Sequence, residues 1–302
     1  MFNTIIVGVD GRQGGRDALA LAERLRSAAG GDVIAVQVYP YEYYVSRGAN
    51  ADFEAVIRAD AETELKAELE RMGIEATALV VPDGSPARAL HREAERHEAS
   101  LIVVGSAHHG RVGRVLAGDV TAGTLHAAPC AVAVAPAGYA DRAGELSAVG
   151  VGYDGSPESD AAVELAKALA DAAGVGLRVM CVLEPSLPWA SYPSSVHDWS
   201  AEAEVVRERT RATVDELVAR LGAGVTGEVL EGAPVRELLF EAGTLGLLVC
   251  GSRSYGPVRR LLLGSTSRRL VHEAPVPVLV LPRGAAHDET AADEASLAAR
   301  TS

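Results

Sequence analysis

Aromatic side chains are scarce in this sequence of 302 residues, because Phe, Trp and Tyr together make up only 4% of it. Hydrophobic residues as a whole make up 48%, an ordinary share for a globular protein, so the cores are built mainly from Ala, Val and Leu. A basic excess is also lacking, since the formal net charge is -13. Proteins that bind nucleic acids usually carry a basic surface. No nucleic-acid partner is therefore expected, although a small anion in a local basic pocket is compatible with this charge.

Cysteine and long apolar runs are rare as well. The three cysteines are Cys130, Cys181 and Cys250. Their number is odd and no CxxC spacing occurs, so we expect reduced core cysteines rather than a disulfide framework. No apolar run approaches the roughly 20 residues of a membrane span. The first residues, MFNTIIVGVD, have the pattern of a strand and not of a signal peptide. We therefore expect a cytoplasmic protein with no membrane partner.

One internal repeat organises the sequence. VGVDG at 7–11 aligns with VGYDG at 151–155, LIVVGS at 101–106 with LLVCGS at 247–252, and Ala128-Pro129 with Ala274-Pro275. The offset stays between 144 and 148 over all aligned segments, and chance does not keep both order and spacing. Each copy is long enough to bury its own core. We expect domains at 1–137 and 148–283, a linker at 138–147 and a disordered tail at 284–302.

Short apolar runs alternate with helical patterns in both units. The expected strands lie at 4–9, 33–38, 76–81, 101–105 and 131–135, and at 148–153, 176–183, 226–230, 247–251 and 277–281. This alternation predicts an α/β fold with a parallel sheet, right-handed crossovers and helices on both faces. Runs such as LIVVG and LLVCG are apolar throughout, as expected of strands that are buried on both faces.

The loop after the fourth strand of the second unit carries the clearest chemical signal. In an open parallel sheet, ligands bind beyond the carboxyl ends of the strands. This loop leaves a strand through Gly251 and enters a helix through Gly264-Ser265. A helix N-terminus offers unpaired N–H groups and a positive dipole end, which suits a phosphate. Nearby residues add hydroxyl groups and positive charge: Thr266, Ser267, Arg253, Arg259 and Arg260. The alternative is that Ser265 merely caps the helix and the arginines face solvent.

The spacing G-x2-G-x9-G-[ST] after the fourth strand, with a V-D-G-[ST] turn after the first, resembles the signature of the universal stress protein family. The resemblance covers both units, at about residues 3–283. It implies two tandem flavodoxin-like (adenine-nucleotide alpha-hydrolase-like) domains, each a five-stranded parallel sheet of order 3-2-1-4-5 with helices on both faces. It also implies pairing through the last strands, 132–135 and 278–281, within one chain or as a homodimer.

The resemblance further implies a function. ATP-binding members hold adenine between the first-strand turn and the end of the second strand, with the phosphates on the glycine loop. The nucleotide-binding positions carried over to the second unit are Gly152, Asp154, Val182, Gly251, Ser252, Arg253, Ser254, Gly264, Ser265, Thr266 and Ser267. We expect a non-catalytic ATP-binding stress-response or signalling protein with at most weak ATP hydrolysis. No catalytic residue and no metal are expected, apart from Mg²⁺ that accompanies ATP.

Both units depart from the family pattern. Ser254 replaces the second glycine, which costs about 1–2 kcal/mol if that position needs a positive φ. The first unit departs further, and its degenerate equivalents are Asp10, Val38, Gly105, His108, Gly118 and Asp119. Asp119 stands where the second unit has Ser265, and a carboxylate there repels a phosphate by roughly 1 to 4 kcal/mol. Arg12 stands where the second unit has Ser156. We therefore expect the first unit to bind ATP poorly or not at all.

Two other hypotheses about function compete with nucleotide binding. The first is a scaffold of the same fold that binds no nucleotide. The second is an enzyme or a phospho-receiver. VGYDGSPES does not match the S-G-G-x-D-S loop of an ATP-pyrophosphatase. A receiver needs a phosphorylatable Asp after the third strand, where Asp83 is suggestive, and a Lys after the fifth strand, which is missing. Adjacent His108 and His109 favour a polar loop over a metal site.

Overall fold

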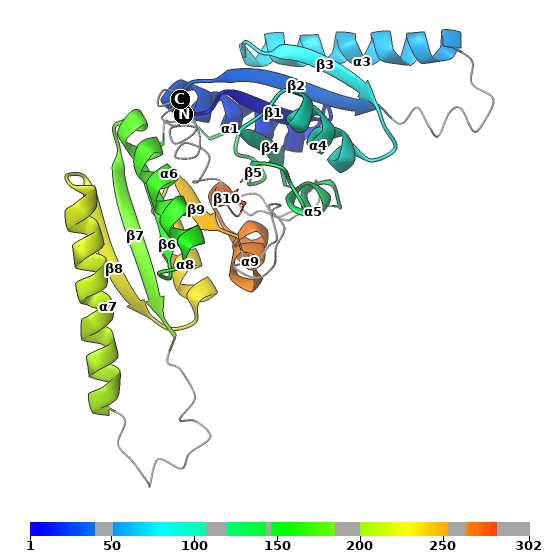
Figure 1. Ribbon diagram of the computed structural model, residues 1–302. Coiled ribbons are helices and arrows are strands. Elements are labelled where there is room, and N and C mark those ends of the chain that lie inside the picture. The colour runs from blue at the N-terminus through cyan, green and yellow to red at the C-terminus, as the bar shows by residue number, and fades with distance from the viewer. Residues whose placement is uncertain (40–50, 107–118, 143–145, 185–199, 253–263, 283–302) are drawn as a thin grey trace, which may run out of the picture.

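The computed structural model of the chain describes residues 1–39, 51–106, 119–142, 146–184, 200–252 and 264–282 (Figure 1). The first unit comprises β1 (Thr4–Val9), α1 (Gln13–Ala29), β2 (Asp32–Tyr39), α3 (Ala51–Met72), β3 (Thr77–Pro82), α4 (Pro86–Arg96), β4 (Leu101–Gly105), α5 (Asp119–Leu125) and β5 (Ala131–Ala135). The second unit comprises β6 (Ala148–Tyr153), α6 (Pro157–Ala173), β7 (Gly176–Leu183), α7 (Ser200–Leu221), β8 (Val225–Glu231), α8 (Pro234–Ala242), β9 (Leu247–Gly251), α9 (Ser265–Glu273) and β10 (Val278–Leu281). All expected strands are present, and no strand boundary moves by more than one residue.

The strands form one ten-stranded sheet in the order β3-β2-β1-β4-β5-β10-β9-β6-β7-β8. Each half is parallel and has the expected order 3-2-1-4-5. The halves meet where β5 and β10 pair antiparallel, with Val278 opposite Val134 and Val280 opposite Val132. These are the two strands that the resemblance named as paired edges, and in this structure they pair within one chain.

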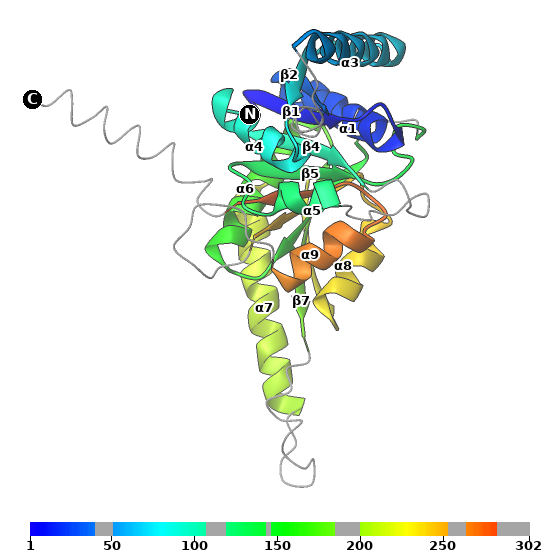
Figure 2. The same ribbon diagram turned by 90° about the vertical axis from the view of Figure 1, so that its right-hand side faces the viewer.

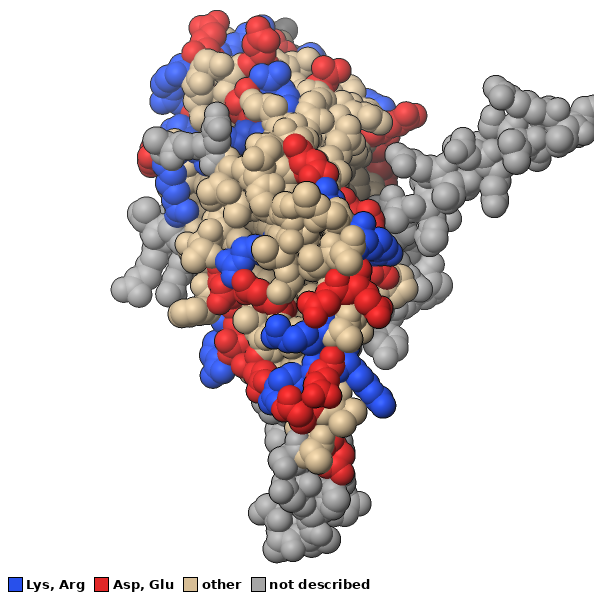
Figure 3. Space-filling view, turned by 90° about the vertical axis from the view of Figure 1, so that its left-hand side faces the viewer, with Lys and Arg blue, Asp and Glu red and all other residues tan. Residues whose placement is uncertain are grey.

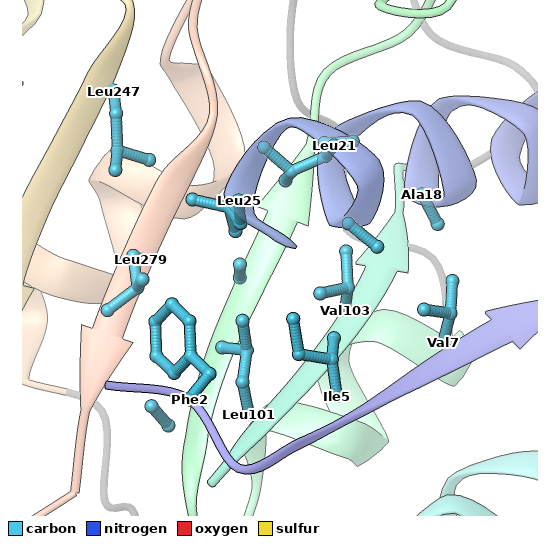
Figure 4. Close-up of a cluster of buried hydrophobic side chains, with 14 of the residues drawn as sticks. Phe2, Ile5, Val7, Ala18, Leu21, Leu25, Leu101, Val103, Leu247 and Leu279 are labelled. Carbon is cyan, nitrogen blue, oxygen red and sulfur yellow. The ribbon is translucent and has the colours of Figure 1, made fainter. Parts of the chain in front are cut away.

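Two hydrophobic cores lie on opposite faces of this sheet. One core is covered by α1, α3, α6 and α7, and the other by α4, α5, α8 and α9 (Figures 1 and 2). Both cores continue across the boundary between the units. On the α1 side, Phe2 and Leu25 of the first unit lie beside Leu279 and Leu247 of the second (Figure 4). The two units therefore share buried surface as well as strand hydrogen bonds.

Local capping fixes where several helices begin. The Ser85 hydroxyl accepts a hydrogen bond from the Arg88 amide at 3.4 Å, and the Ser156 hydroxyl accepts one from the Ser159 amide at 3.2 Å. In both helices a proline follows the capping serine, where its missing N–H costs nothing. As a result, α4 and α6 both begin directly at the carboxyl end of the sheet.

The described helices and one face of the surface bear on membrane and nucleic-acid contacts. Within the described ranges, no helix is long and apolar enough to cross a membrane. On the face seen in Figure 3, acidic and basic side chains intermingle rather than separating by sign. This face offers no broad basic area of the kind that binds a nucleic-acid backbone.

The first half of the expected linker lies against α1. Asp17, which is fully buried, accepts hydrogen bonds from the amides of Gly138 at 2.9 Å and Ala140 at 2.8 Å. Tyr139 between them is also buried. Burial raises the pKa of Asp17, although the two amide hydrogen bonds and one from Gln13 oppose the shift. The chain is therefore fastened to the first unit up to about residue 142.

Because the two cores are continuous, we expect both units to unfold in one cooperative thermal transition. Leu279 is fully buried at the boundary, and Leu279→Ala leaves a cavity there. The substitution should lower the free energy of unfolding by about 2–5 kcal/mol while keeping a single transition. Scanning calorimetry and urea unfolding measure both quantities. The exposed Val205 of α7 provides the control Val205→Ala, which should change stability by less than about 0.5 kcal/mol. Two separate transitions, only one of which moves in Leu279→Ala, would contradict the shared core.

Candidate functional site

The carboxyl ends of β6, β7 and β9 open onto a cavity of about 310 Å³ in the second unit. Residues of α6, α8 and α9 complete its wall. The lining residues are Gly152, Tyr153, Asp154, Ser156, Ser159, Met180, Val182, Pro234, Leu238, Cys250, Gly251, Ser252, Gly264, Ser265, Thr266, Ser267 and Leu270. This is the position at which open parallel sheets bind their ligands.

The inner wall of the cavity is apolar. Met180 and Leu270 are fully buried, and Leu238 and Cys250 nearly so. Burial raises the pKa of the Cys250 thiol to about 12, so it is neutral at physiological pH. An apolar wall with few polar groups is typical of a site for a flat, largely uncharged ring.

The start of α9 presents backbone donors to the cavity. Gly264 is the N-cap of this helix, and no described side chain makes a capping hydrogen bond there. Ser265, Thr266 and Ser267 follow it and line the cavity. The first N–H groups of a helix have no partner within the helix and lie at its positive end. The arrangement therefore suits a small anion.

Ser252 adds a buried hydroxyl that has no hydrogen-bond partner among the described residues. Its backbone amide donates to the Leu281 carbonyl, which fixes the residue beside β10. The side chain lines the cavity and is 7% exposed. A buried polar atom without a partner is costly, so a ligand oxygen or nitrogen at this point would stabilise the site. Ser106 of the first unit also has a buried, unpartnered hydroxyl.

Asp154 supplies the one carboxylate among the described lining residues. Its Oδ1 accepts hydrogen bonds from the Ser156 amide at 3.0 Å and from the Ser156 hydroxyl at 2.5 Å. Burial acts to raise the pKa of Asp154, but these bonds and one from Ser159 outweigh it and hold the pKa below its usual value. Asp154 is therefore ionised at neutral pH. A fixed carboxylate accepts hydrogen bonds from ligand hydroxyl groups and repels phosphate.

Gly251 has a structural reason to be glycine, which lies in its contact with α6. A Cβ atom at Gly251 would lie 2.7 Å from the Glu158 carbonyl oxygen of α6. At the equivalent Gly105, a Cβ would lie 2.0 Å from the carbonyl oxygen of Gly14 in α1. Close approach of the helix to the strand requires these glycines. Approach of a ligand to the backbone is not needed to explain them.

The structure brings the predicted residues of the second unit together. The described ones, Gly152, Asp154, Val182, Gly251, Ser252, Gly264, Ser265, Thr266 and Ser267, all line the same cavity. Arg253 and Ser254 lie outside the described residues. Among the described residues, no group of three or more His, Cys, Asp or Glu side chains could hold a metal ion.

Several residues that line the cavity were not among the positions predicted from the sequence. Met180 lies two positions before Val182 in β7, and strand alternation could have placed it on the same face. Ser159 lies in the first turn of α6, where its hydroxyl donates to the Ser156 carbonyl at 2.8 Å. Leu238 and Leu270 come from α8 and α9. No local signal marks these two leucines as lining residues, because their neighbours across the cavity are distant in sequence.

The first unit differs from the second at the corresponding place. Asp10 accepts hydrogen bonds from the Arg12 amide at 3.1 Å and the Gly15 amide at 3.3 Å. Arg12 and Gly15 thus stand where the second unit has the hydroxyl groups of Ser156 and Ser159. Val38 is the last residue but one of β2, which extends one residue further than expected to Tyr39, and Gly105 ends β4 as expected. His108 and Gly118 lie outside the described residues. Asp119 begins α5, and its side chain also lies outside them, so the proposed repulsion stays a prediction.

Asp83 occupies a place that does not suit a phospho-receiver. It is buried and pairs with Arg88 at 2.5 Å and with Arg92 at 2.8 Å. Burial acts to raise the pKa of Asp83, but the bonds from Arg88, the Ser85 amide and Arg92 hold it below its usual value. β3 is also an outer strand, with β2 between it and β1. Asp83 is therefore separated from Asp10, whereas a receiver needs its acidic groups together.

Comparison with known proteins identifies what the chain resembles. The model of the family described as "Universal stress protein family" matches residues 1–136 and, a second time, residues 146–282. A universal stress protein of Mycobacterium tuberculosis strain H37Rv is 30% identical over 197 residues, which cover 62% of this chain and 66% of that relative. A second one from the same strain is 31% identical over 203 residues, covering 61% and 62%. The matched region thus spans slightly less than two thirds of these curated relatives.

Solved structures show the same fold over nearly the whole chain. A universal stress protein from Archaeoglobus fulgidus has a TM-score of 0.62 at 21% identity, and covers 93% of this chain and 99% of its own. A protein of unknown function from Pseudomonas aeruginosa PAO1 has a TM-score of 0.65 at 17% identity, with 99% and 98% covered. At these identities the likeness establishes the fold alone.

The shifted pKa of Asp154 gives a test of the site's electrostatics. A carboxylate whose pKa is lowered on folding contributes stability above its unfolded pKa of about 3.8, and this contribution is lost as the pH falls through the folded value. Asp154→Asn should therefore lower the Tm at pH 7, and the deficit should shrink below about pH 4. Because the carboxylate is exposed, the effect at pH 7 should stay below about 1 kcal/mol. Thermal melts from pH 3 to pH 7 measure it. A deficit that grows on acidification would contradict the direction of the shift.

Proposed function

Since this chain belongs to the universal stress protein family, with both tandem units matched, we propose that it is a cytoplasmic, non-catalytic stress-response or signalling protein that binds ATP or another adenine nucleotide mainly through its second unit. The observation that carries the proposal is the cavity at the ends of β6, β7 and β9. It combines an apolar inner wall with a helix start that no described side chain caps.

The chemistry of the lining suggests how such a ligand is held. An adenine ring suits the wall formed by Met180, Val182 and Leu238. Asp154 is ionised, so it suits the ribose hydroxyl groups better than the phosphates. The phosphates suit the start of α9, where backbone N–H groups and the hydroxyl groups of Ser265 and Thr266 are available, while the Ser267 hydroxyl donates to the Gly264 carbonyl at 3.4 Å. Mg²⁺ would accompany the phosphates, with hydroxyl and phosphate oxygens as its natural ligands.

The described residues also support the inequality between the units. Arg12 and Gly15 of the first unit replace two hydroxyl residues that line the cavity of the second. The exchange of Arg12 for Ser156 was expected from the sequence, and the exchange of Gly15 for Ser159 adds to it without depending on Asp119. The proposal is therefore one nucleotide per chain.

A nucleotide-independent scaffold is the second candidate. It is favoured by the pairing of β5 with β10 and by the shared cores, because these hold the units together without any ligand. A scaffold of this kind would present the same fold and gain no stability from ATP.

Titration with ATP separates the two candidates. We expect isothermal titration to give a stoichiometry of one, and millimolar ATP to raise the Tm. Gly264 has φ −69°, which any residue adopts, and Asp is a favourable N-cap, so Gly264→Asp should fold. Its charge should weaken ATP binding by at least about 10-fold. Gly264→Asn, which is similar in size and uncharged, is the matched control and should bind more tightly than Gly264→Asp.

Two results would decide against the proposal. A wild type that gains no stability at millimolar ATP would exclude nucleotide binding and favour the scaffold. The wild type should bind without the substitution Asp119→Ser. If changes in the first unit reduced the affinity for ATP as much as Gly264→Asp does, the proposed inequality between the units would be refuted. Phosphate release should be at most weak in all variants.

The two buried serines provide a matched pair. Ser252→Ala and Ser106→Ala each remove a hydroxyl without a described partner, so both should leave the ligand-free stability unchanged or raise it by up to about 1 kcal/mol. Only Ser252→Ala should weaken ATP binding, by about 5-fold for one lost hydrogen bond of about 1 kcal/mol. Calorimetric titration of both variants measures the difference. An equal effect of the two substitutions would show that Ser252 does not contact the ligand.

A further inference from the structure

Arg142 connects the segment after the first unit to the helix that carries the candidate anion site. Its Nη1 donates to the carbonyl oxygen of Pro275 at 2.9 Å. Pro275 follows the last residue of α9, Glu273, after one intervening residue. The guanidinium therefore lies at the C-terminal end of α9, where a cation complements the negative end of the helix dipole. Ser265, Thr266 and Ser267, which line the cavity, lie at the opposite end of the same helix.

The first unit holds Arg142 in place through its helix α1. Asp17 accepts the amides of Gly138 and Ala140, as described above. The Arg24 guanidinium lies over the Tyr139 ring, 4.2 Å from its centroid, and also donates to the Arg142 carbonyl. The Arg142 amide in turn donates to the Tyr139 carbonyl at 3.1 Å, which closes a turn. We name residues 138–142, held in this way, the brace.

Because α9 is short, the contact of Arg142 just beyond its C-terminal end can affect the orientation of its N-terminal end at the cavity. The helix has 9 residues, which corresponds to about 13 Å at 1.5 Å per residue. Leu270 and Val271 are fully buried and anchor the second half of the helix in the core. A short, rigid helix that is fixed there and just beyond its C-terminal end has little freedom to tilt. Its N-terminal N–H groups are then kept in one orientation.

The holders of the brace are present in one unit only. α1 and α6 both have 17 residues and align without a gap. At the positions of Asp17 and Arg24 in α1, α6 has Ala161 and Ala168. The described part of α6 thus has no carboxylate or guanidinium there to hold an equivalent segment. The brace supports α9 of the second unit, which is the unit with the better-preserved site.

From these contacts we infer that the first unit serves as a positioning device for the ligand site of the second. Asp17 and Arg24 hold residues 138–142, and Arg142 fixes the C-terminal end of α9 so that its N-terminus faces the ligand. Arg142 is a positioning residue that touches no ligand. This inference rests on the proposed nucleotide binding by the second unit.

Arg142→Met tests the brace, because Met keeps much of the apolar stem and removes the guanidinium. We expect the Kd for ATP to rise by about 3- to 10-fold while the protein keeps its fold and a Tm close to that of the wild type. Arg142→Lys should restore part of the affinity. The control is Arg269→Met, which removes an exposed cation of α9 that pairs with Glu273 and should leave the Kd unchanged. An unchanged Kd in Arg142→Met, or an equal rise in Arg269→Met, would overturn the inference.

Hydrogen exchange gives a second readout that needs no ligand. In ligand-free Arg142→Met, backbone amides in α9 should exchange faster than in the wild type, and those of α6 and α8 should not. This result would support the brace even if the wild type bound no ATP, in which case only the proposed function would fail. Unchanged exchange throughout α9 would overturn the brace, whatever the protein binds.

A double-mutant cycle distinguishes one connected brace from two separate effects. Asp17→Asn removes the carboxylate that holds Gly138 and Ala140, and should also raise the Kd for ATP. If the brace acts as a unit, Asp17→Asn combined with Arg142→Met should raise the Kd no further than the larger single change. If the rise in Kd in the double variant equalled the product of the two single rises, Asp17 would not act through Arg142.

Discussion

Antiparallel pairing of β5 with β10 joins the two halves of the chain, and most other features depend on it. It turns two five-stranded sheets into one ten-stranded sheet and aligns their faces, so that the two cores continue from one unit into the other. The last strands then have no free edge, which removes a surface that would otherwise pair with another chain. The pairing also brings α9 near the segment that leaves the first unit. A contact such as that of Arg142 with Pro275 requires this arrangement.

The two units differ at a few residues that lie beyond the carboxyl ends of their strands. The second unit has Ser156 and Ser159 at its first turn, together with an α9 start that no described side chain caps. The first unit has Arg12 and Gly15 at the matching turn and an aspartate at the start of α5. None of these changes disturbs the sheet, since the affected residues lie beyond the strand ends. The side chains beyond the strand ends can therefore differ between the two copies while the sheet stays the same.

The candidate site also separates two roles of glycine that the sequence pattern combines. Gly251 and Gly105 are required because a helix backbone approaches them closely, and this need exists with or without a ligand. Gly264 has an ordinary φ and, having no side chain, makes no capping hydrogen bond at the start of α9. A glycine pattern alone therefore supports the fold more strongly than it supports nucleotide binding. Ser252 has a buried hydroxyl without a described partner, but the equivalent Ser106 of the first unit has one as well, so this feature alone does not mark a ligand site.

The sequence by itself determined the duplication, the strands and most of the candidate site. Strand boundaries followed from runs such as LIVVG, and the predicted second-unit residues that are described all line one cavity, because each lies at a strand end or a helix start that neighbouring residues specify. Only the tertiary structure decided that Leu238 and Leu270 complete the cavity and that the expected linker is fastened to α1. Asp17 and Gly138 are 121 positions apart, and Arg142 and Pro275 are 133 apart. Such contacts depend on how the sheet and helices pack, and local periodicity contains no information about them.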